Sequence, residues 1–539
     1  TQSPYLPAFD WGVLDHADGN SMGYGITVAG NFVFVSGSMV QTVRVVNPAT
    51  GVEVESTNEG ADGDVYLTKV GLDGTPTDIW TFGGSESEFP AHLASHDMNI
   101  SFTGYFSGNI TFGDYTFLNV KDPATRDRDG YVVKISGVDG SVQWARHFEA
   151  SAGSQTSGTT FDSAGNIAFT MRRCVYLTDG SGGEECHGVV SLLDGDTGAT
   201  LWEHTFGTAV GNFGDVVLST DGNTLYAVGS LIGTTDFGGA VGTLSSSSAA
   251  VSDALLVAMN VADGTVTWAG LVTAVSSAST SSSALVEAAN GFVWMACSGG
   301  CELASSTASS VTVSIQNKEH SGAVVKFVEA TGIPEFVADV PSALGMAVDG
   351  TNVFVNTHSS STMTFGDTTF SSMGSLDQYI MKVDGTGAGS WVITTGGTGL
   401  EYVRRMASDS NGDLYSIGLT QSNPSHFDPI ELTTHATDDG YDVFIAKLMT
   451  SNEVLPPCLV DATTVASDMC FVSNVCYDSG EFSRAAIHKC RYCDPATSTT
   501  DVAGGDLTNF CEIDGVCYAS GEYRQLPAGF GTVDSECQI

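Results

Sequence analysis

The segment Asp409-Ser-Asn-Gly-Asp-Leu-Tyr-Ser-Ile417 joins a tight turn to a short apolar strand. Gly, Asn and Asp supply the turn, and aromatic and β-branched residues supply the strand. The same turn-and-strand pattern occurs seven times along the chain, at Asn31-Phe-Val-Phe-Val35, Asn99-Ile-Ser-Phe-Thr103, Asn166-Ile-Ala-Phe-Thr170, Thr224-Leu-Tyr-Ala-Val228, Gly291-Phe-Val-Trp-Met295, Asn352-Val-Phe-Val-Asn356 and Asp413-Leu-Tyr-Ser-Ile417. A local pattern that recurs at regular intervals predicts a repeat protein.

A second strand and a tryptophan-bearing strand follow the first in each repeat. The second strand, as in Asp442-Val-Phe-Ile-Ala-Lys447, ends in lysine, and five of the eight lysines take this position: Lys69, Lys134, Lys326, Lys382 and Lys447. Tight turns such as Asp73-Gly74 and Asp139-Gly140 then lead to the next strand. That strand holds Trp11, Trp80, Trp144, Trp202, Trp268 or Trp391, with Phe336 in one repeat, at an average spacing of about 63 residues.

Each period therefore holds four strands and no helical periodicity. Four antiparallel strands repeated seven times predict an all-β fold, a seven-bladed β-propeller over residues 1–452. The first tryptophan strand, around Trp11, precedes any complete repeat, and the last repeat stops at Leu448 without one. We therefore expect the N-terminal strand to complete the last blade and close the ring, which removes free sheet edges. Small disulfide-rich modules are expected over residues 453–539.

Composition and charge exclude several classes of partner. The chain of 539 residues has 62 acidic and 19 basic residues, a formal net charge of −43. Nucleic acids and anionic membranes need clustered Lys and Arg, so neither is expected as a partner. No run of 18 apolar residues occurs, so no membrane-spanning helix is expected. The opening Thr1-Gln-Ser-Pro4 is typical of a mature, already processed secreted chain.

Cysteine usage also favours a secreted protein. Cys174 with Cys186, and Cys297 with Cys301, are spaced for local disulfides. Eight more crowd the C-terminal segment: Cys458, Cys470, Cys476, Cys490, Cys493, Cys511, Cys517 and Cys537. Such a cluster is typical of a disulfide framework, whose pairing the sequence leaves open. The alternative is zinc, because Cys490-Arg-Tyr-Cys493 is a C-x2-C, but no second pair follows at zinc-finger spacing.

The C-terminal segment repeats itself. Cys470-x5-Cys476 continues as Tyr477-Asp-Ser-Gly-Glu481, and Cys511-x5-Cys517 continues as Tyr518-Ala-Ser-Gly-Glu522. These two copies contain too few apolar residues to fold without covalent cross-links. As Cys-rich tandem modules they resemble EGF-like modules.

The propeller motifs resemble the repeat known as SBBP, with the best local match from Gly396 to Lys447. The propeller together with C-x2-C-D-P, from Cys490 to Pro495, resembles the mastigoneme-like proteins of heterokont algae. This resemblance implies a secreted glycoprotein that builds tubular flagellar hairs. The stretch from Asp194 to Trp202 also resembles the turn of a quinoprotein repeat. Quinoproteins, however, usually have eight blades and a calcium-bound cofactor, and no matching ligand set occurs here.

Few residues predict chemistry. No phosphate-binding loop, nucleophile elbow or H-E-x-x-H motif occurs. His147 and His204 fall in equivalent outer strands, where we interpret them as packing or surface residues. The recurring tryptophans, one per blade, are expected to pack between blades rather than to form a sugar-binding platform. Four insertions centred on Phe112, Phe237, Phe365 and Phe427 are expected to fill gaps between blades.

Two kinds of ligand or modification remain open. Asp127 and Asp129 are the best acidic pair for a Ca²⁺ ion, which prefers several oxygen ligands, although turn capping is the simpler role for such residues. Asn99-Ile-Ser and Asn109-Ile-Thr are acceptor sequences for N-linked glycans. We expect no other cofactor and no catalytic residues.

The sequence thus predicts a secreted, non-enzymatic structural glycoprotein located at the cell or flagellar surface. Its partners would be further copies of itself or related propeller subunits in an extracellular filament, joined through propeller faces and the Cys-rich arm. The alternative is an extracellular glycan-binding or adhesion protein that uses one propeller face. An enzyme would need carboxylates that converge in the central funnel, and the sequence predicts no such cluster.

Overall fold

The computed structural model describes residues 6–17, 21–40, 42–57, 63–84, 86–119, 128–177, 183–239, 241–247, 252–274, 285–297, 301–303, 322–366, 368–433 and 441–454, and in the C-terminal segment only short strands. Two compact units divide the chain: Phe9–Ser361 with Ser372–Ser451, and Thr1–Ala8 with Thr362–Ser371 and Asn452–Ile539. The first unit contains the blades. The described residues form strands and turns, and none of them forms a helix long and apolar enough to cross a membrane.

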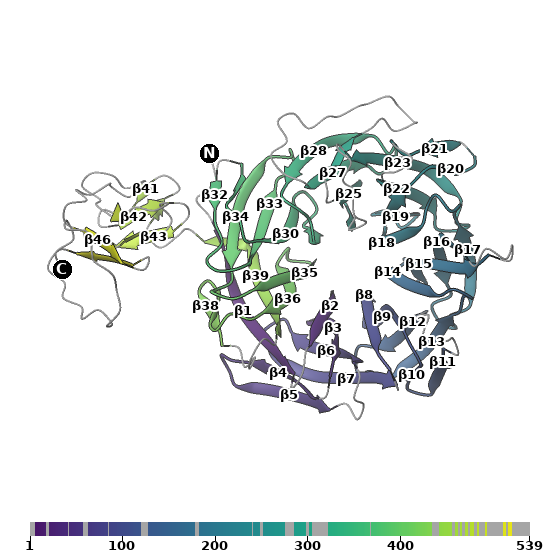
Figure 1. Cartoon of the computed structure of the whole chain (residues 1–539), viewed down its shortest axis with the longest axis horizontal. Helices are drawn as coiled ribbons and strands as arrows, with labels where there is room; N and C mark the ends of the chain where they lie inside the picture. Colours follow the sequence, from purple (N-terminus) through teal and green to yellow (C-terminus); the bar gives the residue numbers. More distant parts are fainter. Residues whose placement is uncertain are drawn as a thin grey trace. The chain divides into compact units, whose positions relative to one another are not determined.

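Seven antiparallel sheets surround a central axis, as Figure 1 shows. One strand of each sheet lies nearest the axis. These innermost strands are β2 (Met22–Ala29), β8 (Glu88–His96), β14 (Ser154–Phe161), β18 (Asn212–Leu218), β24 (Leu285–Ala289), β29 (Gly345–Val348) and β35 (Glu401–Ser408). The next strands outward are β3 (Phe32–Met39), β9 (Asn99–Phe106), β15 (Ile167–Tyr176), β19 (Thr224–Leu231), β25 (Phe292–Cys297), β30 (Val353–Ser359) and β36 (Leu414–Thr420).

The third and fourth strands complete each blade. The third strands, which carry the repeated lysines, are β6 (Asp64–Gly71), β12 (Asp129–Ser136), β16 (Glu184–Leu193), β22 (Asp253–Asn260), β27 (Gly322–Val328), β33 (Asp377–Val383) and β39 (Asp442–Val454). The outer strands, which carry the tryptophans, are β7 (Pro76–Gly84), β13 (Val142–Phe148), β17 (Thr200–Thr205), β23 (Val266–Ala274), β28 (Pro334–Val340), β34 (Gly389–Thr395) and β1 (Leu6–Ala17). The predicted seven-bladed β-propeller is confirmed.

The N-terminal strand closes the ring as expected. The last sheet has the order β35-β36-β39-β1, so a strand from the start of the chain is the outer strand of the seventh blade. Its packing is apolar, because Val13 and Leu14 of β1 are buried. A hairpin of β4 (Thr42–Asn47) and β5 (Val52–Thr57) extends the same sheet beyond β1.

Short hairpins are inserted in sequence between the second and third strands of four blades. They are β10 (Asn109–Phe112) with β11 (Tyr115–Leu118), β20 (Thr234–Asp236) with β21 (Thr243–Ser245), β31 (Met363–Phe365) with β32 (Thr368–Phe370), and β37 (Ser425–Phe427) with β38 (Ile430–Leu432). A single strand, β26 (Cys301–Leu303), pairs with β23. Phe112 packs against Phe82 of the first blade and Phe102 of the second, with ring centroids 5.5 and 5.7 Å away. This insertion fills an interblade gap as predicted, and Phe365 is also buried.

An interblade latch repeats around the ring. In each latch, the aromatic side chain of one outer strand lies against a glycine in the turn before the next blade's outer strand. The six pairs are Trp11–Gly74, Trp80–Gly140, Trp144–Gly198, Trp202–Gly264, Trp268–Gly332 and Phe336–Gly387. A Cβ atom at any of these glycines would lie 2.4 to 2.9 Å from the ring, and their φ angles run from +65° to +89°. At the seventh blade the outer strand β1 comes from the N-terminus, so no hairpin turn of the third strand leads into it there.

Hydrogen bonds strengthen the latches. The indole N–H of Trp144 donates to the carbonyl oxygen of Gly195 at 2.9 Å, and the Lys134 ammonium donates to the same oxygen at 2.8 Å. Lys69 likewise donates to Val138 of the next blade at 3.1 Å. The repeated tryptophan and lysine therefore act together on the neighbouring turn, which confirms the prediction that the tryptophans pack between blades.

The second unit is described through its strands: β40 (Leu459–Asp461), β41 (Thr464–Val465), β42 (Met469–Val472), β43 (Val475–Asp478), β44 (Phe482–Ser483), β45 (Arg491–Tyr492), β46 (Phe510–Ile513) and β47 (Val516–Ala519). The two motif copies form hairpins in the same register, with Cys470 opposite Tyr477 and Cys511 opposite Tyr518. The predicted disulfide framework of this segment lies outside the described side chains.

Candidate functional site at the propeller axis

A cavity of about 300 Å³ lies at the axis of the ring. All seven innermost strands line it, with polar groups that include His92, Asp215, Glu287 and Arg405. These four side chains come from β8, β18, β24 and β35, which lie in four different blades. The ring closure therefore assembles a charged cluster from positions far apart in the sequence.

Backbone irregularities position three of these side chains. The register of the innermost strand shifts between Pro90 and His92, between Phe213 and Asp215, and between Val403 and Arg405. A β-bulge turns the following side chain away from the regular alternation of the strand. In β2 the residue after the equivalent shift is Gly25, so that blade contributes no side chain at this level.

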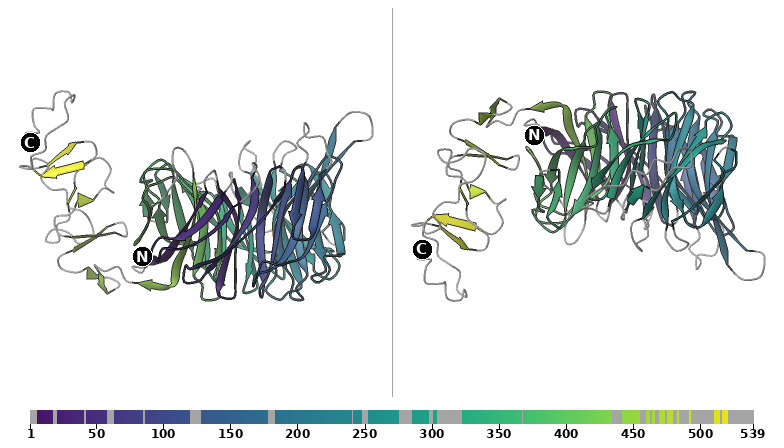
Figure 2. Two further views of the ribbon diagram at one scale, coloured as in Figure 1. Left: turned by 90° about the horizontal axis from the view of Figure 1, so that it is seen from below. Right: turned by 90° about the horizontal axis from the view of Figure 1, so that it is seen from above.

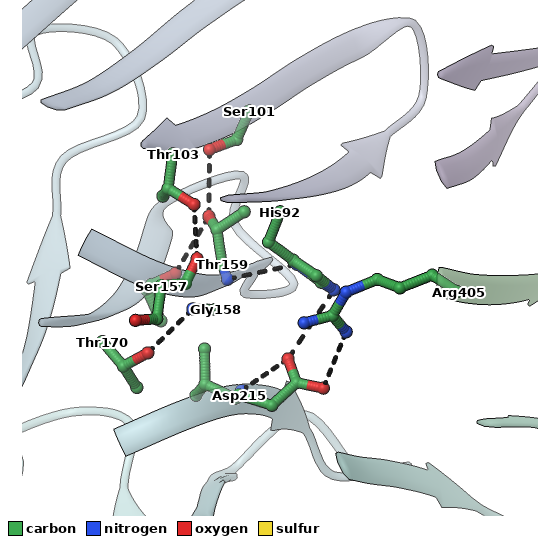
Figure 3. A network of polar contacts seen from close by, with 11 residues as sticks. His92, Ser101, Thr103, Ser157, Gly158, Thr159, Thr170, Asp215 and Arg405 are labelled. Carbon is green, nitrogen blue, oxygen red and sulfur yellow. Dashed lines mark hydrogen bonds and ion pairs between the residues drawn. The ribbon is translucent and has the colours of Figure 1, made fainter. Parts of the chain in front are cut away.

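Asp215 is the centre of the cluster, as Figure 3 shows. Its Oδ2 atom lies 3.3 Å from Nη1 of Arg405, and its Oδ1 atom lies 3.6 Å from Nε2 of His92. The backbone N–H of Val216 also donates to Oδ1 at 3.0 Å. The Asp215 side chain is only 7% exposed, so the guanidinium compensates a charge that would otherwise be buried alone.

His92 is held in one orientation from both sides. Its Nδ1 atom accepts a long hydrogen bond of 3.4 Å from the backbone N–H of Thr159, and its Nε2 atom faces Asp215. Burial, together with the positive charge of Arg405, lowers the pKa of His92 to about 4. A neutral imidazole whose two nitrogens both face protein groups has no free lone pair to act as a general base.

Glu287 has a different environment. Burial, followed by repulsion from Asp215, raises the pKa of its carboxyl group to about 8, and Arg405 opposes this shift only in part. Its side chain is half-buried because it borders the cavity. Among the described residues, no hydrogen-bond donor reaches the Glu287 carboxyl group. The group is therefore a protonated carboxyl at neutral pH that faces an open space.

Several hydroxyl groups of the wall are bonded within the wall. Ser95 donates to the carbonyl oxygen of Val28 at 2.7 Å and lies 3.0 Å from the hydroxyl of Thr27. Ser408 donates to the carbonyl oxygen of Val348 at 3.0 Å. These contacts direct the hydroxyls of Thr27, Ser95 and Ser408 to one another or to backbone carbonyl oxygens, not to a side-chain base.

The sequence did not predict this cluster. The expectation that no carboxylates converge in the funnel is wrong, because Asp215 and Glu287 line one cavity. The four residues share no motif, and each occupies the innermost strand, whose sequence repeats least clearly. One sequence signal could have indicated the cluster: some blades have a charged residue at the innermost-strand position where β2 has the small residue Gly25.

The residues singled out by sequence lie elsewhere. Asp129 is buried and faces Nε2 of His147 at 3.1 Å, while Asp127 lies outside the described residues, so calcium at this pair stays a prediction. His147 packs against Phe106, and His204 packs against Phe206 with ring centroids 4.4 Å apart. Both histidines are packing residues, as predicted.

The predicted modification and disulfide sites have mixed outcomes. Cys174 and Cys186 form a disulfide across β15 and β16, as expected. Cys297 is disulfide-bonded, and the side chain of Cys301 lies outside the described residues. Asn99 and Asn109 begin β9 and β10, and both are half-buried. The Oδ1 atom of Asn99 accepts a hydrogen bond from Gln143 at 2.8 Å.

One group of described residues has the ligand types of a metal site: Cys174, Glu184 and Cys186. Because both sulfurs belong to the disulfide, neither is available as a thiolate ligand. Within the described part of the chain, this leaves the axial cluster as the strongest candidate for binding a ligand.

Comparisons with known proteins indicate the fold alone. No protein-family description matches this chain, and no curated protein matches it. Among solved structures, quinohemoprotein alcohol dehydrogenase from Comamonas testosteroni is 11% identical with a TM-score of 0.41, over 82% of this chain and 76% of that one. Kuenenia stuttgartiensis hydrazine synthase is 11% identical with a TM-score of 0.39, over 77% and 96% of the two chains. The Dos1 propeller is 8% identical with a TM-score of 0.39, over 83% and 96%.

Proposed function

We propose that this chain is a secreted, non-enzymatic structural glycoprotein that serves as a subunit of an extracellular filament, such as a flagellar hair. Neighbouring copies would join through the propeller and the Cys-rich segment. The observation that carries this proposal is a projecting hairpin of β15 and β16, which exposes three consecutive apolar side chains next to a disulfide.

The hairpin, here called the stapled arm, comprises residues 172–177 and 183–187. Its two ten-residue strands remain paired out to Tyr176 and Glu184, and the hairpin, drawn in blue-green, extends beyond the strands beside it (Figure 2). Val175, Tyr176 and Leu177 are 37%, 42% and 36% exposed. Consecutive exposed apolar residues on a projection are unusual for a surface that faces only water, and they are typical of contact sites.

The disulfide makes the arm suitable for assembly. Cys174 and Cys186 are directly opposite each other, immediately before the exposed residues. A cross-linked hairpin loses less conformational entropy on binding than a free loop does, so more of the apolar contact energy is retained. An arm on one copy that enters a surface elsewhere on the next copy gives a head-to-tail contact, and such contacts propagate into fibres when they do not close.

The propeller supplies a rigid body for such an assembly. The six interblade latches and the strand contributed by the N-terminus tie the blades together around the ring. A fibre that bears mechanical load needs subunits whose parts do not shear past one another. The repeated indole and ammonium hydrogen bonds between blades support this role.

Within the axial cluster, His92 is not placed to act as a general base, which agrees with the non-enzymatic proposal. Asp215 is engaged by Arg405, both nitrogens of His92 face protein groups, and the nearby hydroxyls bond within the wall. A general base needs a free lone pair within reach of a substrate proton, and this geometry offers none at His92.

The test compares self-association of the full chain with that of an arm variant. The double change Tyr176→Ser and Leu177→Ser removes apolar surface from the arm, and Leu118→Ser removes it from the exposed strand β11, where Leu118 is 60% exposed. Sedimentation and electron microscopy should show assemblies of the wild type and the Leu118→Ser control, and discs only for the arm variant. Equal assembly of all three proteins would contradict the proposal, and glycan binding by a monomeric wild type would favour an adhesion protein instead.

A further inference from the structure

The axial cavity contains a carboxyl group whose bonding capacity is unused. His92, Asp215, Glu287 and Arg405 are the titratable residues that line the cavity, one each from β8, β18, β24 and β35. Arg405 and His92 both face Asp215, whereas no donor among the described residues reaches Glu287. A carboxyl group at the edge of an open space, without a protein partner, is placed to bind a ligand.

The charges around the cavity select the sign of that ligand. While Glu287 is protonated, the charges of Asp215 and Arg405 balance, since His92 is neutral; ionisation of Glu287 leaves one net negative charge in the cluster. The chain as a whole carries −43, so the potential at the axis attracts cations. An anion would face Asp215 and Glu287 together, and only one guanidinium would attract it.

The ligand geometry favours an ammonium group over a metal ion. Ca²⁺ takes six to eight oxygen ligands, and the residues at this cavity offer two carboxyl groups with a guanidinium beside them. An ammonium group has three N–H donors and needs only two or three acceptors. Glu287 and Asp215 line the same cavity, and their carboxyl oxygens are acceptors of this kind.

We propose that the axial cavity binds the primary ammonium group of a small organic amine between Glu287 and Asp215. The O–H bond of the Glu287 carboxyl group breaks, its proton leaves to water, and the carboxylate accepts a hydrogen bond from the incoming ammonium. The amine keeps its own proton, so one positive charge enters as another leaves. This inference goes beyond the proposed structural role and does not depend on it.

The proposal predicts a specific pH dependence. Because Glu287 must lose its proton, affinity should rise up to tenfold per pH unit and level off above pH 8. An alkyl amine stays protonated over that range, since its pKa is about that of lysine, near 10.4. Proton release should therefore be close to one per ligand at pH 7 and should fall toward zero at pH 9.

Calorimetry of the full chain with spermidine tests the proposal at physiological ionic strength, where binding to exposed charges is screened. Titration in two buffers of different ionisation enthalpy measures the protons released. Glu287→Gln should weaken binding at least tenfold and release no proton. Glu53→Gln, on the exposed strand β5, is the matched control and should behave as wild type.

Two competitors separate the chemistries. Tetramethylammonium has the same charge but no N–H donors, so it should bind at least tenfold more weakly than an alkylammonium of similar size; equal binding would overturn the ammonium assignment. Glu287-dependent binding of Ca²⁺ that displaces spermidine would overturn it in favour of a metal site. If Glu287→Gln fails to fold, the proton release of the wild type decides: no release at pH 7 would refute the proposal.

Discussion

The indole N–H of Trp202 donates to the carbonyl oxygen of Val261 at 2.7 Å, across the boundary between the third and fourth blades. Gly264, in the same turn, lies against the face of that indole with φ +70°. The tryptophan thus fixes the neighbouring turn through a hydrogen bond at its edge and packing at its face. The same relationship at Trp11 and Trp144 makes it a property of the ring rather than of one blade.

Gly264→Ala should destabilise the protein much more than Gly291→Ala. Both glycines have positive φ, +70° and +79°, so both alanines bear the cost of the left-handed conformation, about 1–2 kcal/mol. A Cβ atom at Gly264 would lie 2.6 Å from the Trp202 ring, whereas nothing lies within 4 Å at Gly291. Overpacking adds about 1–3 kcal/mol at Gly264 alone. Urea unfolding measures the difference, and equal losses would show that the latch contributes no packing energy.

Arg405→Gln should destabilise the folded ring because it leaves the buried charge of Asp215 without its partner. Removal of one member of a buried ion pair costs about 3–5 kcal/mol, and replacement of both members by neutral groups costs less. The double variant Asp215→Asn with Arg405→Gln should therefore recover part of the stability lost in Arg405→Gln. A double-mutant cycle from chemical denaturation measures this coupling. Strictly additive effects would mean that the contact of 3.3 Å carries no energy.

Stability should fall as the pH rises from about 5 to neutrality, and Glu401→Gln should reduce that fall. Glu401 and Asp377 are buried, and the backbone N–H of Gly397 is 3.2 Å from an oxygen of each. Burial raises the pKa of Glu401 to about 7, above its ordinary value of 4.5. A raised folded-state pKa gives stability that is complete below pH 4.5 and is lost as the pH rises through 7.

Melting temperatures between pH 5 and 8.5 test this prediction. Between pH 5 and about 7, the free energy of unfolding of the wild type should fall by up to about 1.4 kcal/mol per pH unit more than that of Glu401→Gln. Asp15 and Glu287, whose pKa values burial raises to about 8, should keep a residual slope in the variant. Parallel curves for Glu401→Gln and wild type would show that Glu401 is already ionised in the folded protein.

Reduction of the Cys174–Cys186 disulfide should affect assembly more than folding. The disulfide closes a short hairpin whose strands are already paired, so the Cys174→Ser, Cys186→Ser variant should keep the melting temperature of the propeller within a few degrees. The arm would lose its preorganisation, and self-association should weaken. Analytical ultracentrifugation alongside calorimetry separates the two effects. A large drop in the melting temperature would show instead that the disulfide stabilises the folded propeller.

The sequence predicted those features that repeat. Seven copies of one pattern predicted seven blades, and the unpaired strand around Trp11 predicted closure by the N-terminus, because both follow from counting strands. The lysines of the third strands also pointed to a shared structural position, and Lys69 and Lys134 confirm it by bonding to the next blade. Periodic residues are informative because every blade imposes the same requirement.

The axial cluster could not be predicted in the same way. His92, Asp215, Glu287 and Arg405 each break the pattern of their own blade, and they meet only because the ring closes. The β-bulges that aim three of them at the axis depend on backbone geometry that no local sequence signal specified. The buried pair Asp377 and Glu401 was missed for a similar reason, since its members belong to adjacent blades.

The central claim is that this propeller is a filament subunit, and electron microscopy of native material tests it most directly. Protein released gently from the source cell surface, without refolding, would be imaged by negative stain. The account predicts regular filaments whose repeat matches one propeller disc and which dissociate when the stapled arm is altered. A population of isolated discs under salt-matched conditions would contradict it.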